Sequence, residues 1–117
     1  MNKRLVGGEK EQKIRSYMEQ KGYIILEMNF RCRQGEVDII ARNDEYLVFV
    51  EVKYRSDAAN GFPEDAVDRR KQKRICQAAR YYMYINNMNE YTPVRFDVAG
   101  ILGDEIKYTE NAFIWLG

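Results

Sequence analysis

The chain has 117 residues, of which 45% are hydrophobic and 32% are charged, and its formal net charge is +1. This balance is typical of a globular protein with a substantial core, and it excludes a disordered chain. The sequence contains no histidine, which excludes Ser-His-Asp triads, HExxH metalloproteases and metal sites with imidazole ligands. Catalysis by this chain must therefore use carboxylates, lysine, tyrosine or a metal ion held by oxygen atoms.

The sequence also predicts a cellular location. No stretch approaches the roughly 20 apolar residues of a membrane span, and the basic start at 1–4 is followed by no signal-like apolar region. Cys32 and Cys76 are too few for a zinc site, and they are expected to be reduced thiols. We therefore expect a cytoplasmic protein with no membrane partner.

In the first half of the chain, one helix and three strands are expected. The helix covers 9–20, with Ile14, Tyr17 and Met18 on one face and Gly22 as its stop. A strand follows over 23–30. Apolar runs at 37–41 and 46–50, the second continuing to Lys53, then predict two more strands that complete a meander.

The second half is expected to add a helix and a strand. A polar loop over 56–61 precedes Pro63, which suits the first turn of a long helix over 64–85. The tyrosines at 81–84 are expected to pack this helix against the sheet. A strand over 94–101 then returns parallel to its neighbour, and a weaker segment ends at 113–116. The order α-β-β-β-α-β predicts a single α/β domain over 1–117, with a mixed sheet flanked by helices.

Two acids interrupt the apolar strands. Asp38 lies within the run at 37–41, and Glu51 ends the run at 46–50. Side chains alternate along a strand, so Glu51 and Lys53 share a face with two apolar residues, while three valines occupy the other face. A buried carboxylate without a partner is costly, so such acids commonly hold a metal or take part in chemistry.

The relative position of the two acids depends on the turn between their strands. A two-residue loop at Asp44-Glu45 would set Asp38 directly opposite Glu51. A loop with an odd number of residues would place them on opposite faces. The prediction of one shared site therefore depends on this register.

Two motifs in these strands carry a resemblance to a known family. They are Gly-Glu-Val-Asp-Ile-Ile-Ala at 35–41 and Phe-Val-Glu-Val-Lys-Tyr-Arg at 49–55. Together they resemble the YraN-like family of predicted endonucleases, which is similar to archaeal Holliday-junction resolvases and belongs to the restriction-endonuclease-like superfamily. The similarity extends over nearly the whole chain, through Gly8-Glu9, Gly22-Tyr23, Asn29-Phe30-Arg31, Val67 with Lys71, Ala78-Ala79, Arg95-Phe96-Asp97-Val98 and Asn111-Ala112-Phe113.

The resemblance implies a restriction-endonuclease-like fold and a metal-dependent nuclease site. Asp38 and Glu51 would be ligands of Mg²⁺ or Mn²⁺, aided by the backbone carbonyl of Val52. Lys53 would orient or activate the attacking water, or stabilise the charge that develops on the phosphate. Glu9, on the first helix, would face the same cleft. The charged sequence around Glu9 leaves Glu11 open as the alternative helical acid.

The chemistry of phosphodiester hydrolysis agrees with these roles. One or two Mg²⁺ ions can neutralise the phosphate, generate hydroxide and stabilise the leaving oxygen. Mg²⁺ keeps several of its waters, so two acids and one carbonyl are a sufficient set of protein ligands. Lys53, beside Glu51, would supply a compact cation near the phosphate.

The partner implied by the resemblance is nucleic acid, specifically branched or structured DNA. Five cations occupy the six positions 69–74, and two interpretations of them remain open. They form either a solvated helix start or a face that contacts phosphates next to the cleft. Lys71, which also matches the family pattern, and Arg55 are the candidate phosphate contacts.

The acids have structural interpretations as well. Glu51 and Lys53 could form a charge pair on a solvated sheet, although their apolar neighbours favour a functional site. Asp97 is expected to be structural. The function predicted is a metal-dependent endonuclease, and a symmetric cut of two strands would require a homodimer. Two alternatives on the same fold are a non-catalytic DNA-binding module and a protein-interaction domain.

Overall fold

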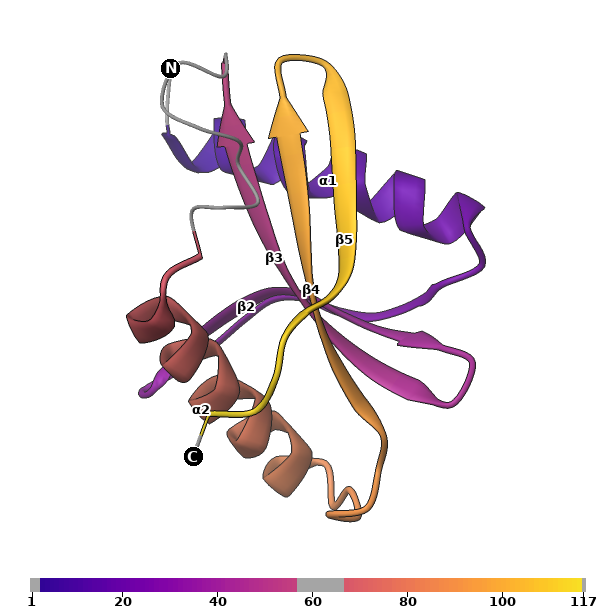
Figure 1. The fold of residues 1–117 in the computed structure, drawn as a ribbon, viewed down its shortest axis with the longest axis vertical. Coiled ribbons are helices and arrows are strands. Elements are labelled where there is room, and N and C mark those ends of the chain that lie inside the picture. Colours follow the sequence, from indigo (N-terminus) through magenta and orange to yellow (C-terminus); the bar gives the residue numbers. More distant parts are fainter. Residues whose placement is uncertain (1–2, 57–66, 117) are drawn as a thin grey trace.

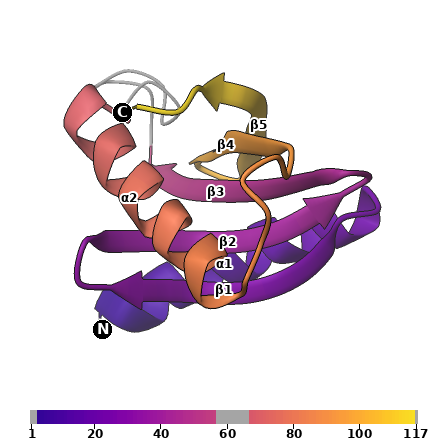
Figure 2. The same cartoon turned by 90° about the horizontal axis from the view of Figure 1, so that it is seen from below.

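The computed structural model of the protein describes residues 3–56 and 67–116, and it forms one five-stranded sheet with a helix on each face (Figures 1 and 2). None of the helices in this part of the chain is long and apolar enough to cross a membrane. The elements in chain order are α1 (Lys3–Gln20), β1 (Ile24–Cys32), β2 (Gly35–Asn43), β3 (Tyr46–Arg55), α2 (Arg69–Ile85), β4 (Val94–Leu102) and β5 (Glu105–Phe113).

The strands lie in the sheet in the order β1-β2-β3-β4-β5. The first three form an antiparallel meander, and β4 runs parallel to β3 after the crossover through α2. This arrangement confirms the predicted mixed α/β class and the predicted parallel return. The antiparallel strand β5 is an addition to the predicted order.

The predicted boundaries differ from the observed ones at several points. Helix α1 begins at Lys3, six residues before the expected start, and β5 ends at Phe113, after which residues 114–116 have no regular structure. Helix α2 begins at Arg69. Its expected start at 63–64 and the loop expected over 56–61, apart from residue 56, lie outside the described residues. Both cysteines are free, as expected.

The turn between β2 and β3 has the length that joins the two acids. Asn43 pairs with Tyr46 across the two-residue loop Asp44-Glu45, and Asp44 has a φ of 55°. Asparagine and aspartate tolerate this left-handed conformation, so the sequence suits the turn. Because the loop is even, the register that pairs Ile39 with Val50 places Asp38 opposite Glu51 at the next step.

Strand β3 is buried on both faces, as its sequence predicts. Leu47 and Phe49 pack in the cluster that includes α2, whereas Val48 and Val50 pack in the cluster that includes Ile14 of α1. Glu51 follows directly on these buried residues. It therefore enters the space between the sheet and α2.

The β1–β2 hairpin packs tightly against α2. A Cβ atom at Gly35 would lie 2.7 Å from the carbonyl oxygen of Arg74, so a side chain there requires the helix or the hairpin to move. This backbone contact fixes the hairpin that carries Asp38 against the helix that carries Lys71.

Candidate functional site

Glu51 is the buried acid at the centre of the site. Its side chain is 5% exposed, and its Oε1 atom lies 3.5 Å from both Lys53 Nζ and Lys71 Nζ. The other oxygen, Oε2, is buried without a hydrogen-bond partner among the described residues. Burial, and then the nearby Asp38, raise the pKa of Glu51 to about 7, although both lysines oppose this shift. Such an incompletely satisfied acid is characteristic of a functional site.

Asp38 is held beside Glu51 by the backbone of the neighbouring strand. The β2–β3 pairing stops at Ile39 and Val50, and beyond it the Val52 N–H donates a hydrogen bond of 2.7 Å to Asp38 Oδ2. Burial raises the pKa of Asp38, whereas this hydrogen bond lowers it. The N–H and C=O of an extended residue point to the same side, so the Val52 carbonyl also faces β2. The Val52 carbonyl would have to face β2, where Asp38 lies, to serve as the predicted metal ligand.

The helical acid that approaches the site is Glu11. Burial, and then the charge of Asp38, raise the pKa of Glu11, whereas Glu9 is exposed to solvent. Glu11 precedes the buried Ile14 and Met18 by three and seven residues, so all three lie on one helical face. Of the two alternatives that the sequence leaves open, the geometry favours Glu11, and this spacing was the signal that could have found it.

Asn29 of β1 is a further site residue that sequence analysis did not predict. Met28 pairs with Ile39 and Phe30 with Val37, so Asn29 lies opposite Asp38. Its φ is 54°, which is unusual for a residue other than glycine within a strand. Its polar side chain faces Glu11, where it acts to lower the pKa of that acid. Backbone strain of this kind clusters at functional sites.

The two lysines reach Glu51 from different elements. Lys53 lies two residues farther along β3, on the same face, and Lys71 comes from the first turn of α2. The start of that helix is fixed by Asp68, whose Oδ1 accepts a hydrogen bond of 2.8 Å from the Lys71 N–H. Lys71 was predicted to contact phosphates. Its ammonium lies 3.5 Å from Glu51 Oε1, where its charge lowers the pKa of both Glu51 and Asp38. The phosphate contact stays a prediction.

Arg55 extends the face of β3 that carries Glu51 and Lys53. Its guanidinium donates to the carbonyl of Tyr54 at 3.3 Å, and its own carbonyl accepts a hydrogen bond from Gly103 N. These contacts place Arg55 at the end of β3, outside the group of acids.

The oxygen atoms of the site suit a partly hydrated divalent ion. In residues 3–56 and 67–116, no three acidic or cysteine side chains converge closely enough to enclose a metal by themselves. The unpartnered Oε2 of Glu51 and the Asp38 carboxylate are nevertheless hard oxygen donors. Mg²⁺ and Mn²⁺ prefer such donors, and Mg²⁺ keeps water in its remaining positions. The residues present therefore fit the predicted ion, with water completing its coordination.

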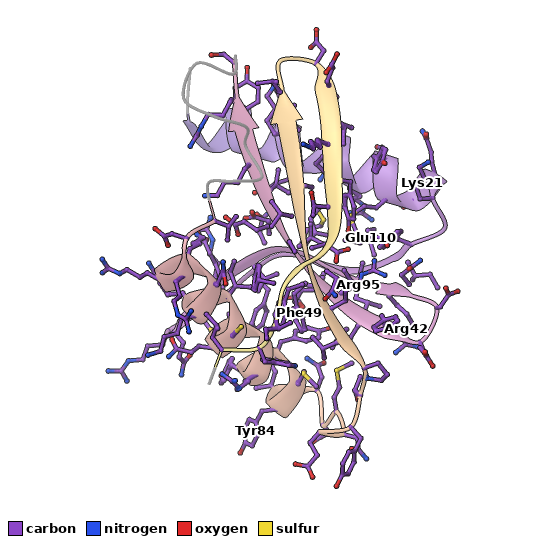
Figure 3. The ribbon with its side chains drawn as sticks, viewed as in Figure 1. Lys21, Arg42, Phe49, Tyr84, Arg95 and Glu110 are labelled. Atoms are coloured by element: carbon purple, nitrogen blue, oxygen red, sulfur yellow. The ribbon has the colours of Figure 1, made fainter. Side chains whose placement is uncertain are left out.

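A second buried acid, Asp97 of β4, lies outside this site. It pairs with Val50 in the β3–β4 register and is 0% exposed. Arg95 donates two hydrogen bonds of 2.9 Å to it, the Tyr108 hydroxyl donates one of 2.6 Å, and the Asn111 N–H donates one of 2.9 Å. Figure 3 shows Arg95 beside the point where the strands cross. These contacts agree with the structural role predicted for Asp97.

Comparison with known proteins places the chain in a family. Residues 10–101 match the profile of the uncharacterised protein family UPF0102. The chain is 50% identical over 113 residues to a UPF0102 protein of Lachnoclostridium phytofermentans, which covers 97% of this chain and 96% of that protein. It is also 39% identical over 115 residues to UPF0102 protein FN1370 of Fusobacterium nucleatum, which covers 98% and 95% respectively. The protein therefore belongs to the UPF0102 family.

Proposed function

We propose that this protein is an endonuclease that hydrolyses phosphodiester bonds in DNA with Mg²⁺ or Mn²⁺. The observation that carries the proposal is the state of Glu51. One of its oxygens is held by two lysines at 3.5 Å, the other is buried without a partner, and Asp38 lies across the hairpin. The fold thus excludes water from a carboxylate and leaves an oxygen available for a cation.

The oxygen atoms of Asp38, Glu51 and Val52 support the proposal of a metal site. Glu51 Oε2, the Asp38 carboxylate and the Val52 carbonyl would hold the ion, which would supply positive charge to the phosphate and lower the pKa of a bound water. The Val52 N–H fixes the orientation of Asp38 by a hydrogen bond of 2.7 Å. Glu11, which Asn29 faces, adds a third carboxylate on the side of α1.

The lysines have different roles in this proposal. Lys71 contacts Glu51 Oε1 from α2, so the unpartnered Oε2 would be the oxygen left to hold an ion. Lys53 is 25% exposed and lies on the strand that leads out of the site, so its ammonium can reach both Glu51 and a phosphate. It would orient the attacking water or stabilise the charge that develops on the phosphate oxygens.

Cleavage assays test the proposal directly. Duplex, flap and four-way-junction DNAs are incubated with the protein in Mg²⁺, Mn²⁺, Ca²⁺ or EDTA. We expect cleavage in Mg²⁺ or Mn²⁺ only, and its loss in Asp38→Asn, Glu51→Gln and Lys53→Ala. The matched control is Glu105→Gln, which neutralises an exposed acid in the β4–β5 hairpin and should cleave like the wild type. Cleavage by Glu51→Gln at the wild-type rate would overturn the proposal.

DNA binding in EDTA separates the endonuclease from a non-catalytic DNA-binding module. Without metal, Asp38 and Glu51 place negative charge where the phosphate would lie, so their neutral variants should bind DNA equally well or more tightly. Arg55→Gln should weaken binding and lower its salt dependence by about one unit of slope. If folded acid variants bind markedly less DNA, those carboxylates do not face the phosphate. Salt-sensitive binding without cleavage in any metal would favour the non-catalytic module.

A further inference from the structure

The outer side of α2 carries a second surface, away from the acids. Arg69, Lys73, Arg80 and Tyr84 follow one another along one strip of the helix at spacings of four, seven and four residues. The segment 114–116 runs beside this strip, where Arg80 Nη2 donates a hydrogen bond of 3.0 Å to the Leu116 carbonyl (Figure 1). Two cavities lie along the strip and the segment, and we call the two together the α2–tail groove.

One end of the α2–tail groove is basic. A cavity of about 440 Å³ is lined by Arg69, Arg70, Lys73 and Leu116. None of these three cations forms an ion pair with an acid in the described part of the chain. They also lie in the first turns of α2, where the helix dipole disfavours positive charge. A bound polyanion would remove this electrostatic cost.

The other end of the groove is aromatic and apolar. A cavity of about 540 Å³ is lined by Met83, Tyr84, Met88 and Trp115, with Arg80, Glu90 and Thr92 among its polar groups. The Arg80 guanidinium lies 4.8 Å from the centre of the Trp115 ring, so a base would meet the Arg80–Trp115 pair and Tyr84. Tyr84 is 79% exposed and projects from the end of α2 into solvent (Figure 3). Flat rings and methionine suit the face of a nucleobase. Glu90 repels phosphate here, but it can accept a hydrogen bond from an amino group of a base.

The basic cavity suits the phosphates of a single nucleic-acid strand, and the aromatic cavity suits one of its bases. Arg69 and Arg80 are 11 residues apart on one helix, which separates them by about 16 Å, a span of a few nucleotides. We propose that the α2–tail groove binds a short unpaired segment of nucleic acid, with its phosphates at Arg69, Arg70 and Lys73 and a base against Tyr84 and Trp115. An apolar partner helix would leave the three cations without neutralising charge, so the composition favours the nucleic acid.

This site rests on the proposed function in one respect, namely that the unpaired segment belongs to the DNA that is cleaved. Lys71 lies in the same helical turn as Arg69, Arg70 and Lys73 and points instead to Glu51. A strand in the groove would therefore lie on the opposite side of α2 from the acids, and it would have to continue around the start of the helix to reach them. The preferred substrate would be DNA with a single-stranded branch or overhang, and a fully paired duplex would be a poorer one.

The fluorescence of Trp115 provides a test that needs no cleavage. Trp115 is the only tryptophan of the chain, and it lines the aromatic cavity. Oligothymidylate is added in EDTA, and we expect it to quench the emission with an affinity that falls as salt is raised. Inorganic phosphate at the same ionic strength should not quench it, since it cannot fill the aromatic cavity.

Matched variants assign the signal to the groove. Arg69→Glu with Lys73→Glu should weaken oligothymidylate binding by about tenfold or more, because two phosphate contacts are reversed in charge. Tyr84→Ala should weaken it by roughly 5- to 100-fold, the range found for loss of one base-stacking contact. The controls are Lys21→Glu, an exposed cation at the far end of α1, and Tyr91→Ala, which removes a tyrosine that is 83% exposed and does not line the cavity. Both controls should bind like the wild type.

The outcomes separate this proposal from the proposed function. Wild-type quenching in the Arg69/Lys73 and Tyr84 variants, or no quenching at all, would overturn the groove site even if metal-dependent cleavage is found. Quenching that these variants abolish, in a protein that cleaves no DNA in any metal, would support the groove and overturn the endonuclease. Asp38→Asn and Glu51→Gln should leave the quenching unchanged. The Tm of each variant is measured to show that it is folded at the temperature of the titration.

Discussion

Two buried acids on adjacent strands of this protein have opposite surroundings. Asp97 of β4 is 0% exposed and accepts four hydrogen bonds, so its charge is fully compensated. Glu51 of β3 is 4% exposed, yet one of its oxygens has no partner among the residues described. Both interrupt apolar strand sequences. Burial alone therefore does not distinguish these two acids, whereas the completeness of their hydrogen bonding does.

The largest expected difference between the two acids is in stability. Asp97→Asn removes the buried carboxylate that accepts two hydrogen bonds from Arg95 and leaves only the exposed Glu110, 3.9 Å away, as an acid beside that guanidinium, so it should cost about 3 kcal/mol of the free energy of unfolding. Glu51→Gln removes a group whose pKa is raised to about 7, so ionisation of Glu51 opposes folding at neutral pH. Its stability should therefore equal or exceed that of the wild type. Urea unfolding at pH 7.5 measures both, and a large loss in Glu51→Gln would show that this acid is structural.

Binding of a divalent ion should also distinguish the two acids. Its effect on stability should be somewhat smaller than that of Asp97→Asn. An ion that binds only the folded state at about 100 times its Kd adds about 2.7 kcal/mol, or roughly 10 °C in Tm for a domain of this size. We expect Mg²⁺ or Mn²⁺ to raise the Tm of the wild type but not that of Asp38→Asn or Glu51→Gln. The exposed-acid variant Glu105→Gln should retain the shift, and EDTA should reverse it. Equal shifts in all four proteins would place the ion elsewhere.

Alkaline pH should act on the surroundings of Asp97 through Tyr108. Burial and the negative charge of Asp97 raise the pKa of Tyr108 above its usual value of 10. The unfolded tyrosine ionises near pH 10 while the folded one stays protonated, so this contribution is full below pH 10 and is lost as the pH rises further. The stability of the wild type should thus fall more steeply from about pH 9 to about pH 11 than that of Tyr108→Phe. Parallel curves for the two proteins would contradict this linkage.

The smallest expected effect involves two asparagines with nearly equal φ. Asn29, near Glu51, has a φ of 54°, and Asn111, near Asp97, has a φ of 53°. Asn111 contributes its backbone N–H to Asp97, which Asn111→Gly would keep. Asn29 contributes its side chain to Glu11, which Asn29→Gly would lose.

Both glycine variants should therefore change the free energy of unfolding by only a few tenths of a kcal/mol, since glycine adopts this backbone conformation freely. Only Asn29→Gly should weaken metal binding, as measured by calorimetry, and this loss should disappear in a Glu11→Gln background. Equal metal affinity in both glycine variants would mean that Asn29 does not position Glu11.

Local patterns in the sequence predicted the buried strand β3 and the turn that pairs the two acids. The alternation around Leu47 to Val50 identified a strand buried on both faces, and the Asp44-Glu45 turn supplied the even loop that brings Asp38 and Glu51 together. These features depend on neighbouring residues, which a sequence displays directly. The α/β order followed from the same patterns.

The remaining features depend on contacts between distant segments. Most of β5 is exposed or half-buried, so it lacks the apolar alternation by which strands are predicted. The positive φ of Asn29 leaves no mark in the sequence other than an asparagine within a strand, a position where this residue is uncommon. The direction in which the Lys71 side chain points depends on how α2 packs on the sheet. Helical periodicity alone therefore could not show that Lys71, among the cations of the basic run, contacts Glu51.

The contact between Gly35 and the backbone of α2 has a consequence for how this protein can vary. Even one added methyl group would collide with the Arg74 carbonyl, so mutation at Gly35 is blocked unless the helix shifts as well. The outward positions of α2, in contrast, face solvent and can change without disturbing that contact. Substitutions on the exterior of this helix can thus alter the surface that it presents to a partner, while the distances among the acids and lysines stay the same.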